Sequence, residues 1–583
     1  MTTQYLLKNA EIVWNEETPI SAQYRDIYWQ KNAAIKEKYH VFIKPFKELS
    51  EKMPIKSQIT VCELGLGFGV NLMLAAEVWR HIPSSKKLNF ISIEKHPVAK
   101  PLMEKALRSE SFKYKEEFLS KYPEPYRGQH VLWIGDNIRV LLVFEDVSQG
   151  LANLDAQVDF WFLDGFSPKK NELMWKAGVF KRIRNMSRPG AKIATYSAAQ
   201  QVKETLEKNG FVTTKKKGFG EKKEMITGSL GNEWLPANHG EGNFAIIGSG
   251  LAGLFCAEAL TKRQIRPIVI NEGITGPSYI PQLSVYPHLA KRAEPKYRMS
   301  LLASNYMRDA VGFNPCSFIW KPKTKKEIDR LRVICSYFPD ELMFELEKNS
   351  FCFTNAGWFN TQTLKSYLSL EEISEKITDI HYGSIWQGYS NRKKVFSSEN
   401  LILATGSSLS LLPAELEIRK IKGQAISIKT EGLNHIINDE VTIFPTNKGT
   451  SVVSGTYTNK SSLEISSRDT ERLLKNAFRL LGKETPAENE WTGLRAIAKD
   501  RVPIVGQAPE WRSLENTQRV RDVKIFKSGL YYCLAFASRG ATNARLYSEN
   551  LISKILGEPS ALGLTEQNIL SPSRFFIRNQ TRK

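Results

Sequence analysis

The chain has 583 residues, of which 42% are hydrophobic, so it is long enough for two to four domains and has the composition of an ordinary folded protein. Its formal net charge is +21, divided as +9 over residues 1–240 and +12 over the remainder, which favours a large anionic partner; a basic enzyme with solvated lysines is the alternative. No apolar run approaches the roughly 18 residues of a membrane span, no secretory signal is visible, and the six cysteines form no CxxC pair, so we expect a soluble, cytoplasmic protein without a metal site or a disulfide framework.

The first predicted elements are a strand, a glycine-rich turn and a helix. Residues 58–63 are predicted to form a buried strand and residues 70–79 an amphipathic helix, with LGLGFG between them. Glycine lets the backbone approach a ligand where side chains would collide, although such a turn can also bind a dinucleotide or merely pack tightly. The candidate cofactor-binding residues of this turn are Glu63, Gly65, Gly67 and Gly69.

Acidic residues end the next two predicted strands. The strand in residues 89–97 ends at Glu94, at about the separation from the glycines where an acidic side chain accepts hydrogen bonds from ribose hydroxyls. The strand in residues 130–137 ends at Asp136, which we expect to bind an adenine amino group or the atoms beside it. Both residues are candidate cofactor ligands.

A fourth strand begins at residue 158 and carries the candidate catalytic residues at its carboxyl end, where open α/β sheets bind ligands. Asp164 is followed by a glycine and then by Phe166, which gives a carboxylate beside an aromatic wall. Such a pair can hold an amine in line with a methyl sulfonium and take up its proton or developing positive charge. The alternative is that Asp164 only caps the following helix.

A second strand–turn–helix signature opens another domain. Residues 229–242 are rich in Gly, Asn and Pro and are predicted to be a linker, with the boundary near residue 240. Residues 243–260 then form the dinucleotide fingerprint, with the next strand ending in an acid, and this pattern does not separate FAD from NAD. The candidate cofactor residues are Gly248, Gly250, Gly253 and Glu272.

A later segment favours FAD. Residues 399–408 (ENLILATGSS) read as a strand that runs into a turn of small residues, which flavoproteins place against the FAD. The candidate cofactor residues of that turn are Ala404, Thr405 and Gly406.

Two segments near the end of the chain resemble flavin-contacting segments of the glycine and D-amino-acid oxidase group. They are WTGLRAIAKDRVPIVG (491–506) and LAFASRGAT (534–542), and the second contains the candidate cofactor residue Gly540. The resemblance implies that Arg495 and Arg539 clamp a substrate carboxylate, as two guanidinium groups can do in bidentate fashion. The alternative for each arginine is a structural ion pair at the surface.

Motifs along the whole chain, in one consistent order, resemble the MnmC family of bifunctional tRNA 5-methylaminomethyl-2-thiouridine biosynthesis proteins. The chain departs from the family pattern at Glu172, where a proline is common, and at Leu283, where a glycine is usual. These departures concern local loop shape. The matching segments are PISAQYRDIYW (19–29), ELGLGFG (63–69), LDGFSPKKNELMW (163–175), IATYSAAQQVKETLEKNGF (193–211), SYIPQLSVYPHLA (278–290), KGQAISI (422–428) and SGTYT (454–458).

The resemblance implies an α/β chain with two catalytic domains and S-adenosylmethionine (SAM), FAD and tRNA as ligands. A Rossmann-like SAM methyltransferase domain is expected over residues 1–228, followed by the linker and an FAD-dependent oxidoreductase domain over residues 243–583. The oxidoreductase domain combines a Rossmann-type FAD-binding part with a mixed α+β substrate part. The flavin-binding parts are expected at about 243–300, 350–410 and 490–560, and the substrate parts at about 300–350 and 410–490. We expect a monomer.

The implied activity has two steps on the wobble uridine of tRNA. The FAD-dependent half would remove the carboxymethyl group of 5-carboxymethylaminomethyl-(2-thio)uridine, and the SAM-dependent half, with Asp164 as its catalytic carboxylate, would methylate the resulting 5-aminomethyl-(2-thio)uridine to 5-methylaminomethyl-(2-thio)uridine. An oxidase that recognises a glycine-like carboxylate exposes the nucleophile that an amine methyltransferase needs. Two alternatives stay open: a glycine- or sarcosine-type oxidase fused to a metabolite methyltransferase, and a tRNA-binding protein with one inactive half.

Overall fold

The computed structural model describes residues 4–29, 34–220, 224–231, 233–238, 240, 242–273, 276–459, 462–511, 517 and 519–580. The chain divides into two compact units. The N-terminal unit comprises Gln4–Glu241 and Ser553–Leu564, and the C-terminal unit comprises Gly242–Ile552 and Thr565–Lys583. The predicted linker contains positions 232, 239 and 241, which lie outside the described residues, and the domain limits drawn from the sequence stay a prediction.

Five parallel strands form the centre of the N-terminal unit, in the order β9-β8-β4-β5-β7 within a nine-stranded sheet. β4 and β8 are buried along their whole length, as is typical of parallel strands covered on both faces. The bounds are β4 (Ser57–Leu64), β5 (Lys87–Glu94), β7 (Ile138–Phe144), β8 (Val158–Leu163) and β9 (Ser187–Thr195).

Antiparallel strands complete this sheet. β6 pairs with β7, β11 with β9, β10 with β11, and β12 with β4. A separate three-stranded sheet consists of β1, β2 and β3. The bounds are β1 (Ile12–Asn15), β2 (Thr18–Ser21), β3 (Asp26–Ile27), β6 (Gly128–Ile134), β10 (Phe211–Lys217), β11 (Glu224–Leu230) and β12 (Ala237–Asn238).

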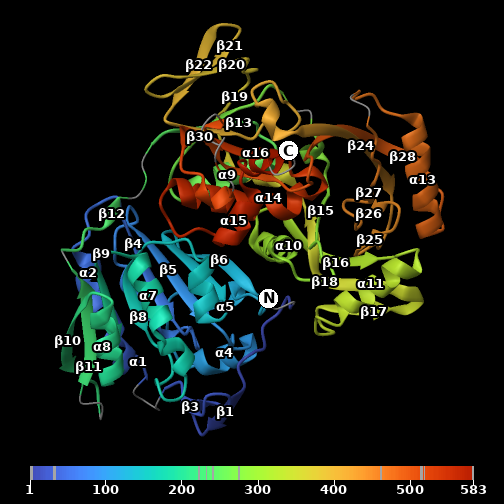
Figure 1. The fold of residues 1–583 in the computed structure, drawn as a ribbon. Coiled ribbons are helices and arrows are strands. Elements are labelled where there is room, and N and C mark those ends of the chain that lie inside the picture. Colours follow the sequence, from blue (N-terminus) through green and yellow to red (C-terminus); the bar gives the residue numbers. More distant parts are fainter. Residues whose placement is uncertain are drawn as a thin grey trace. The chain divides into compact units, whose positions relative to one another are not determined.

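The helices of the N-terminal unit pack against the central sheet. Phe42 and Phe46, from the segment before β4, pack on Phe162 of β8 with ring centroids 5.2 and 6.3 Å apart. Figure 1 shows α7 and α8 side by side along the sheet. The bounds are α1 (Ala34–Lys38), the π-helical turn η1 (Tyr39–Ile43), α2 (Lys44–Glu51), α3 (Val70–Trp79), α4 (Lys100–Leu107), α5 (Lys115–Lys121), α6 (Val147–Asn153), the 3-10 turn η2 (Glu172–Trp175), α7 (Ala177–Met186) and α8 (Gln200–Lys208).

The C-terminal unit begins with a second parallel sheet, in the order β19-β14-β13-β23-β30-β29, in which only β29 is antiparallel to its neighbour. α9 follows β13 and presents a largely buried surface of small and apolar residues, as predicted for the helix of a dinucleotide fingerprint. The bounds are β13 (Phe244–Ile247), α9 (Leu251–Thr261), β14 (Ile268–Ile270), β19 (Glu372–Ile373), β23 (Asn400–Leu403), β29 (Ile504–Pro509), β30 (Phe526–Leu534), the 3-10 turn η9 (Ala537–Arg539) and α14 (Gly540–Ile555).

A nine-stranded mixed sheet forms the rest of the core of this unit, in the order β15-β18-β16-β25-β26-β27-β24-β28, with β17 paired to β18. β18, which the sequence groups with the flavin-binding parts, pairs with β16, which it groups with the substrate parts, and that division stays a prediction. The bounds are β15 (Leu283–Val285), β16 (Phe313–Trp320), β17 (Met343–Leu346), β18 (Ser350–Phe359), β24 (Ile418–Lys429), β25 (Ile436–Asn438), β26 (Thr442–Ile443), β27 (Thr450–Ser454) and β28 (Ala487–Ala498).

Apart from short 3-10 turns, the remaining elements in the described part of the C-terminal unit are six α-helices and a three-stranded sheet. They are α10 (Pro295–Tyr306), α11 (Lys325–Cys335), α12 (Thr361–Leu368), α13 (Ser467–Leu481), α15 (Leu564–Leu570), α16 (Arg574–Gln580), β20 (Asp379–Tyr382), β21 (Trp386–Ser390) and β22 (Lys393–Ser398). In the part of the chain that the structure describes, no helix is long and apolar enough to cross a membrane. The predicted α/β class is confirmed in both units.

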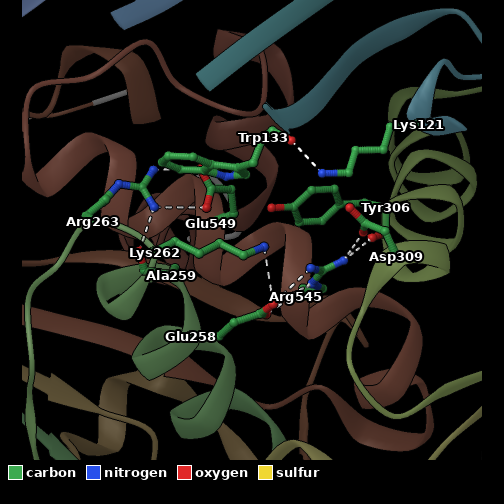
Figure 2. Close-up of polar contacts among 10 residues, drawn as sticks. All are labelled: Lys121, Trp133, Glu258, Ala259, Lys262, Arg263, Tyr306, Asp309, Arg545 and Glu549. Carbon is green, nitrogen blue, oxygen red and sulfur yellow. Dashed lines mark hydrogen bonds and ion pairs between the residues drawn. The ribbon is translucent and has the colours of Figure 1, made fainter. Parts of the chain in front are cut away.

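Buried ion pairs link α9 and its end to α14 (Figure 2). Arg545 donates to Glu258 from Nη2 at 2.8 Å and from Nε at 3.0 Å, and Arg263 pairs with Glu549 at 2.6 Å. Burial pushes the pKa of Glu258 up, but the charge of Arg545, assisted by Lys262, outweighs burial and holds that pKa below its usual value. The two charges are therefore mutually dependent within the core.

Candidate active sites

The N-terminal unit contains a cavity of about 310 Å³ at the carboxyl ends of β4, β5, β7 and β8. It lies where the topology of an open α/β sheet places a ligand. Among the residues predicted from the sequence, those that line the cavity are Gly65, Gly67, Glu94, Asp164 and Phe166.

The glycine turn after β4 passes close to the candidate catalytic strand end. A Cβ atom at Gly65, whose φ is +96°, would lie 3.2 Å from the carbonyl oxygen of Asp164, and one at Gly67 would lie 3.3 Å from the ring of Tyr28. Gly69, whose φ is +73°, is the N-cap of α3 and does not line the cavity. The turn therefore leaves room for backbone only, as the sequence predicts.

Asp164 follows β8 and is paired inside the cavity. Lys38, the last residue of α1, forms an ion pair with Oδ2 of Asp164, and Asn71 donates to the same oxygen at 2.7 Å. Burial raises the pKa of Asp164, while Lys38 and Asn71 oppose the increase. The next helical turn, η2, has Asn171 as its N-cap, so the alternative that Asp164 caps a helix is wrong.

Glu63 lies behind Asp164 and does not line the cavity. Its Oε1 accepts from Asn71 at 2.8 Å, and its Oε2 accepts from Ser92 at 2.6 Å. Burial, followed by the charge of Asp164, raises the pKa of Glu63 to about 8. Asn71 thus joins Glu63 to Asp164, and a direct contact of Glu63 with the cofactor stays a prediction.

Glu94 ends β5, and backbone N–H groups orient its carboxylate. Gly67 donates to Oε2 at 3.2 Å and His96 donates to Oε1 at 2.8 Å. Burial raises the pKa of Glu94, and these backbone donors oppose the increase. The residue joins the glycine turn to the next strand end, which is the position predicted for an acid that accepts from a ribose.

Asp136 lies at the wrong edge of the sheet, which corrects its assignment. β6 runs antiparallel to β7, and Ile138 at the start of β7 pairs with the start of β5, so the turn that holds Asp136 is about 20 Å along the strands from Glu94. The acidic residues at the carboxyl end of β7 are Glu145 and Asp146, and both line the cavity. The direction of a short strand could not be read from its composition.

Aromatic rings form one wall of the cavity. The centroid of Phe166 lies 4.9 Å from that of Tyr24 and 5.1 Å from that of Tyr28. Trp175 donates to the carbonyl of Phe166 at 2.9 Å and thereby fixes the loop. The turn η2 begins at Glu172, one of the two positions where the chain departs from the family pattern. Leu173 of this turn is 50% exposed and lines the cavity.

The C-terminal unit contains a larger cavity of about 670 Å³. It begins at the carboxyl ends of β13, β14 and β23 and continues to β27 and β28 of the mixed sheet. The predicted residues that line it are Gly248, Gly250, Glu272, Ala404, Thr405, Gly406, Arg495 and Gly540.

Backbone contacts explain the glycines of the second fingerprint. A Cβ atom at Gly248, whose φ is +112°, would lie 2.3 Å from the carbonyl oxygen of Ala404, and one at Gly253 would lie 1.8 Å from the carbonyl oxygen of Gly248. Gly253 therefore lets α9 pack on the turn and does not itself line the cavity. Glu272, two residues after the end of β14, is exposed, and its Oε2 lies 3.5 Å from Nζ of Lys376.

Arg495 lies in a slot on β28. A Cβ atom at Gly423 would meet its guanidinium at 2.6 Å, and the ring centroid of Tyr457 lies 5.0 Å from its central carbon. Its Nη1 donates to the carbonyl of Thr456 at 3.3 Å, and it forms no ion pair with any described residue. Burial lowers the pKa of Arg495. The slot thus presents a cation without a counter-charge to the cavity.

Arg539 does not line the cavity, which corrects the expected pair. Its guanidinium carbon lies 5.1 Å from the ring centroid of Tyr286, and Tyr286 does line the cavity. Its Nη1 is buried and has no hydrogen-bond partner among the residues that the structure describes. Leu283, the second position where the chain departs from the family pattern, is the first residue of β15 and lines the same cavity.

Two residues that contact Asp164 carry no motif in the sequence, namely Lys38 of α1 and Asn71 of α3. Tyr24 and Tyr457 lie within the matching segments 19–29 and 454–458, but the sequence does not single them out as site residues. The π-helical turn η1 follows Lys38 directly, and such turns are frequent at functional sites, but the sequence gives no sign of it.

Comparisons with known proteins agree with this division. Residues 109–231 match the model of the S-adenosyl-L-methionine-dependent methyltransferase family, and residues 371–552 match that of the FAD dependent oxidoreductase family. The chain is 29% identical over 97% of its length to a tRNA 5-methylaminomethyl-2-thiouridine biosynthesis bifunctional protein MnmC of Leptospira interrogans, covering 99% of that protein. A protein of the same name from Marinomonas sp. is 28% identical over 100% of this chain and 99% of its own length.

Among solved structures, the glycine oxidase of Geobacillus kaustophilus resembles part of the chain. It covers 57% of this chain and 98% of its own length, with 17% identity and a TM-score of 0.48.

Proposed function

The chain belongs to the MnmC family of bifunctional tRNA 5-methylaminomethyl-2-thiouridine biosynthesis proteins, and on that premise we propose that its two cavities act in succession on the wobble uridine of tRNA. The C-terminal cavity removes the carboxymethyl group of 5-carboxymethylaminomethyl-(2-thio)uridine, and the N-terminal cavity methylates the amine that remains. One observation carries the proposal: one cavity holds Arg495, which has no ion pair among the described residues, and the other holds the buried carboxylate of Asp164.

The C-terminal residues fit FAD. Gly250, the N-cap of α9, lines the cavity where a pyrophosphate would lie at the start of that helix. Glu272 lines the cavity after β14, and the turn at Ala404 packs against Gly248. Bound FAD supplies the two-electron acceptor for oxidation of the C–N bond. These residues would hold the cofactor, and a different residue, Arg495, would hold the substrate.

Arg495 is the proposed contact for the substrate carboxylate. Its guanidinium has a free side toward the cavity and no ion pair among the described residues. A bidentate contact to a carboxylate is geometrically specific, and it fixes the neighbouring C–N bond in one orientation. Arg539 is separated from the cavity by Tyr286, so Arg495 carries this part of the proposal.

The N-terminal residues fit SAM. Gly65 and Gly67 allow close approach of the backbone, Glu94 is oriented to accept from hydroxyl groups, and Asp146 lies at the next strand end. Bound SAM supplies an electrophilic methyl group. The position of Asp146, in place of Asp136, suits a contact to the adenine end of the cofactor.

Asp164 orients the amine and receives its proton. A neutral amine attacks the methyl carbon, and the new secondary ammonium then loses a proton to the Asp164 carboxylate. The raised pKa of Asp164 makes that carboxylate a better proton acceptor than an ordinary aspartate. Phe166 and Tyr24 exclude water from this side of the site.

We further propose that the protein acts as a monomer in the cytoplasm. The six cysteines are free, as is usual in a reducing compartment. Light scattering of the purified protein tests the oligomeric state.

Nucleoside analysis of tRNA tests the function. Purified protein is incubated with undermodified tRNA with and without SAM, and nucleosides are measured by mass spectrometry. Accumulation of 5-aminomethyl-(2-thio)uridine without SAM and its conversion with SAM supports the proposal. Unchanged tRNA together with rapid oxidation of free glycine would instead identify a small-molecule enzyme, and binding with only one conversion would identify an inactive half.

A further inference from the structure

Cations gather around His288 beside the larger cavity of the C-terminal unit. His288 lies on the segment between β15 and α10. Burial, assisted by the charges of Arg539, Arg330 and Lys296, lowers its pKa to about 4, so the imidazole is neutral at pH 7. The ring centroid of Tyr297 lies 5.0 Å from that of His288. The surroundings of His288 are therefore strongly positive although the ring itself is not.

Two hydrogen bonds hold the segment after His288 against α11. Arg330 of α11 donates from Nη1 to the carbonyl of Leu289 at 3.3 Å, and Tyr337 donates to the carbonyl of Lys291 at 2.8 Å. Lys326 lies one helical turn before Arg330 and hence on the same face of α11. We call the resulting surface the His288 patch; its cations are Lys291, Arg292, Lys296, Lys326, Arg330 and Arg539.

Most of these cations lack an acidic partner. Lys296 pairs with Glu294 at 3.4 Å, and none of the other five has an ion pair with a residue in the described part of the chain. Lys291, Arg292 and Lys326 are exposed to solvent. Unpaired cations at this density repel one another, so a ligand with several negative charges would be stabilised here.

Tyr286 connects the His288 patch to the cavity. Its ring lines the cavity, the guanidinium of Arg539 lies 5.1 Å from its centroid, and Phe318 stacks on it at 3.9 Å. The buried Nη1 of Arg539 has no hydrogen-bond partner among the described residues. If one unit of a polyanion enters the cavity beside Tyr286, the negative charges of the neighbouring units would lie on the His288 patch.

We propose that the His288 patch binds phosphates of the anticodon loop next to the wobble nucleotide while that nucleotide occupies the C-terminal cavity. This inference rests on the proposed function and adds the surface that holds the RNA. Lysine and arginine contacts to phosphate carry no sequence information, which suits an enzyme that accepts several tRNAs. Single-stranded loops are also the RNA regions whose bases can be turned outward into a pocket.

A double charge reversal tests the patch. Lys291→Glu with Arg292→Glu is compared with Lys393→Glu with Lys394→Glu, which reverses two exposed lysines of β22 and changes the net charge equally. The tRNA used carries 5-carboxymethylaminomethyl-(2-thio)uridine at the wobble position. Its binding is measured from 50 to 200 mM salt, together with kcat and KM of the oxidation step and the flavin absorbance.

The patch variant is expected to raise the Kd and KM for tRNA at least 10-fold and to reduce the slope of log K against log salt by roughly 1.4, the value for two lost single-strand phosphate contacts. Its kcat at saturating tRNA and its flavin absorbance stay unchanged, and the β22 variant binds like the wild type. Equal behaviour of the two variants overturns the inference alone. Wild-type protein that neither binds nor converts tRNA overturns both the inference and the proposed function.

Discussion

Lys38 and Asp164 form an ion pair in the N-terminal cavity. The carboxylate that is proposed to accept the proton of the amine is therefore already paired with a cation in the free protein. Asn71 holds the same oxygen and also bonds to Glu63. The incoming amine therefore meets a carboxylate that is already paired, and replacement of Lys38 or Asn71 shifts the pKa of Asp164.

Replacement of Lys38 shifts the pH profile of methylation. The Lys38 charge lowers the pKa of Asp164, so Lys38→Gln leaves burial opposed mainly by Asn71 and raises that pKa further. Because methylation needs the ionised carboxylate, the acidic limb of kcat/KM moves to higher pH. Lys36→Gln, at an exposed position of the same helix, serves as the control. An unshifted profile in Lys38→Gln would show that the ion pair does not control Asp164.

Glu63 makes the stability of the N-terminal unit depend on pH. Its folded pKa of about 8 lies above that of the unfolded chain, so the folded state binds a proton that the unfolded state releases. Its contribution is fully present below about pH 4.3 and is lost at up to about 1.4 kcal/mol per pH unit as pH rises toward 8. Glu63→Gln should therefore gain stability relative to the wild type between pH 6 and pH 8.

Hydrogen exchange of the β4 amides in the full chain measures this effect. Glu48→Gln, at an exposed position of α2, should follow the wild type at every pH. A constant difference between Glu63→Gln and the wild type from pH 6 to pH 8 would contradict the raised pKa.

Gly423 is predicted to be essential for the position of Arg495. A Cβ atom there would lie 2.6 Å from the guanidinium, so Gly423→Ala pushes Arg495 out of its slot. The KM for tRNA in the oxidation step should rise about 10-fold or more, since a misplaced guanidinium loses its bidentate contact, while flavin content is unchanged. Gly383→Ala, where a methyl group meets nothing within 4 Å, is the control. Equal KM values for the two variants would remove Arg495 from the site.

The buried pair of Arg545 and Glu258 should be far more costly to break than a surface pair. Arg545→Met leaves Glu258 charged and unpaired in the core, which costs about 3–5 kcal/mol of the free energy of unfolding. Arg332→Met removes the contact to Glu345, in which the arginine is 49% exposed, and should leave the free energy of unfolding nearly unchanged. Urea unfolding of the two variants, monitored by the rise in flavin fluorescence on release, compares their stabilities. Similar urea midpoints for Arg545→Met and Arg332→Met would contradict this account.

The sequence predicts what depends on local pattern. The strand, turn and helix around Gly65 and those around Gly248 are recognisable because the glycines and the apolar runs are adjacent in the chain. The prediction that Asp136 lies at the cofactor edge of the sheet is wrong, because tertiary pairing decides the strand directions of the β6–β7 hairpin. Lys38 is missed for a similar reason, since its contact with Asp164 spans 126 positions and only the packing of α1 creates it.

Arg539 shows the limit of a resemblance between motifs. Its segment matches the oxidase pattern, but the side-chain direction depends on Tyr286, which lies far away in the sequence. The same segment nevertheless places Gly540 at the cavity. Backbone positions are thus predicted better than side-chain directions.

The central claim is that two separate sites act in a fixed order, with the C-terminal cavity first. The direct measurement is mass spectrometry of tRNA nucleosides after reaction with Arg495→Met, Asp164→Asn and the control Asp136→Asn, all with SAM present. Arg495→Met should leave 5-carboxymethylaminomethyl-(2-thio)uridine, Asp164→Asn should accumulate 5-aminomethyl-(2-thio)uridine with methylation slowed by about 10²-fold or more, and Asp136→Asn should form the methylated product. Methylated product from Arg495→Met at the wild-type rate, or no aminomethyl intermediate from Asp164→Asn, would contradict the account.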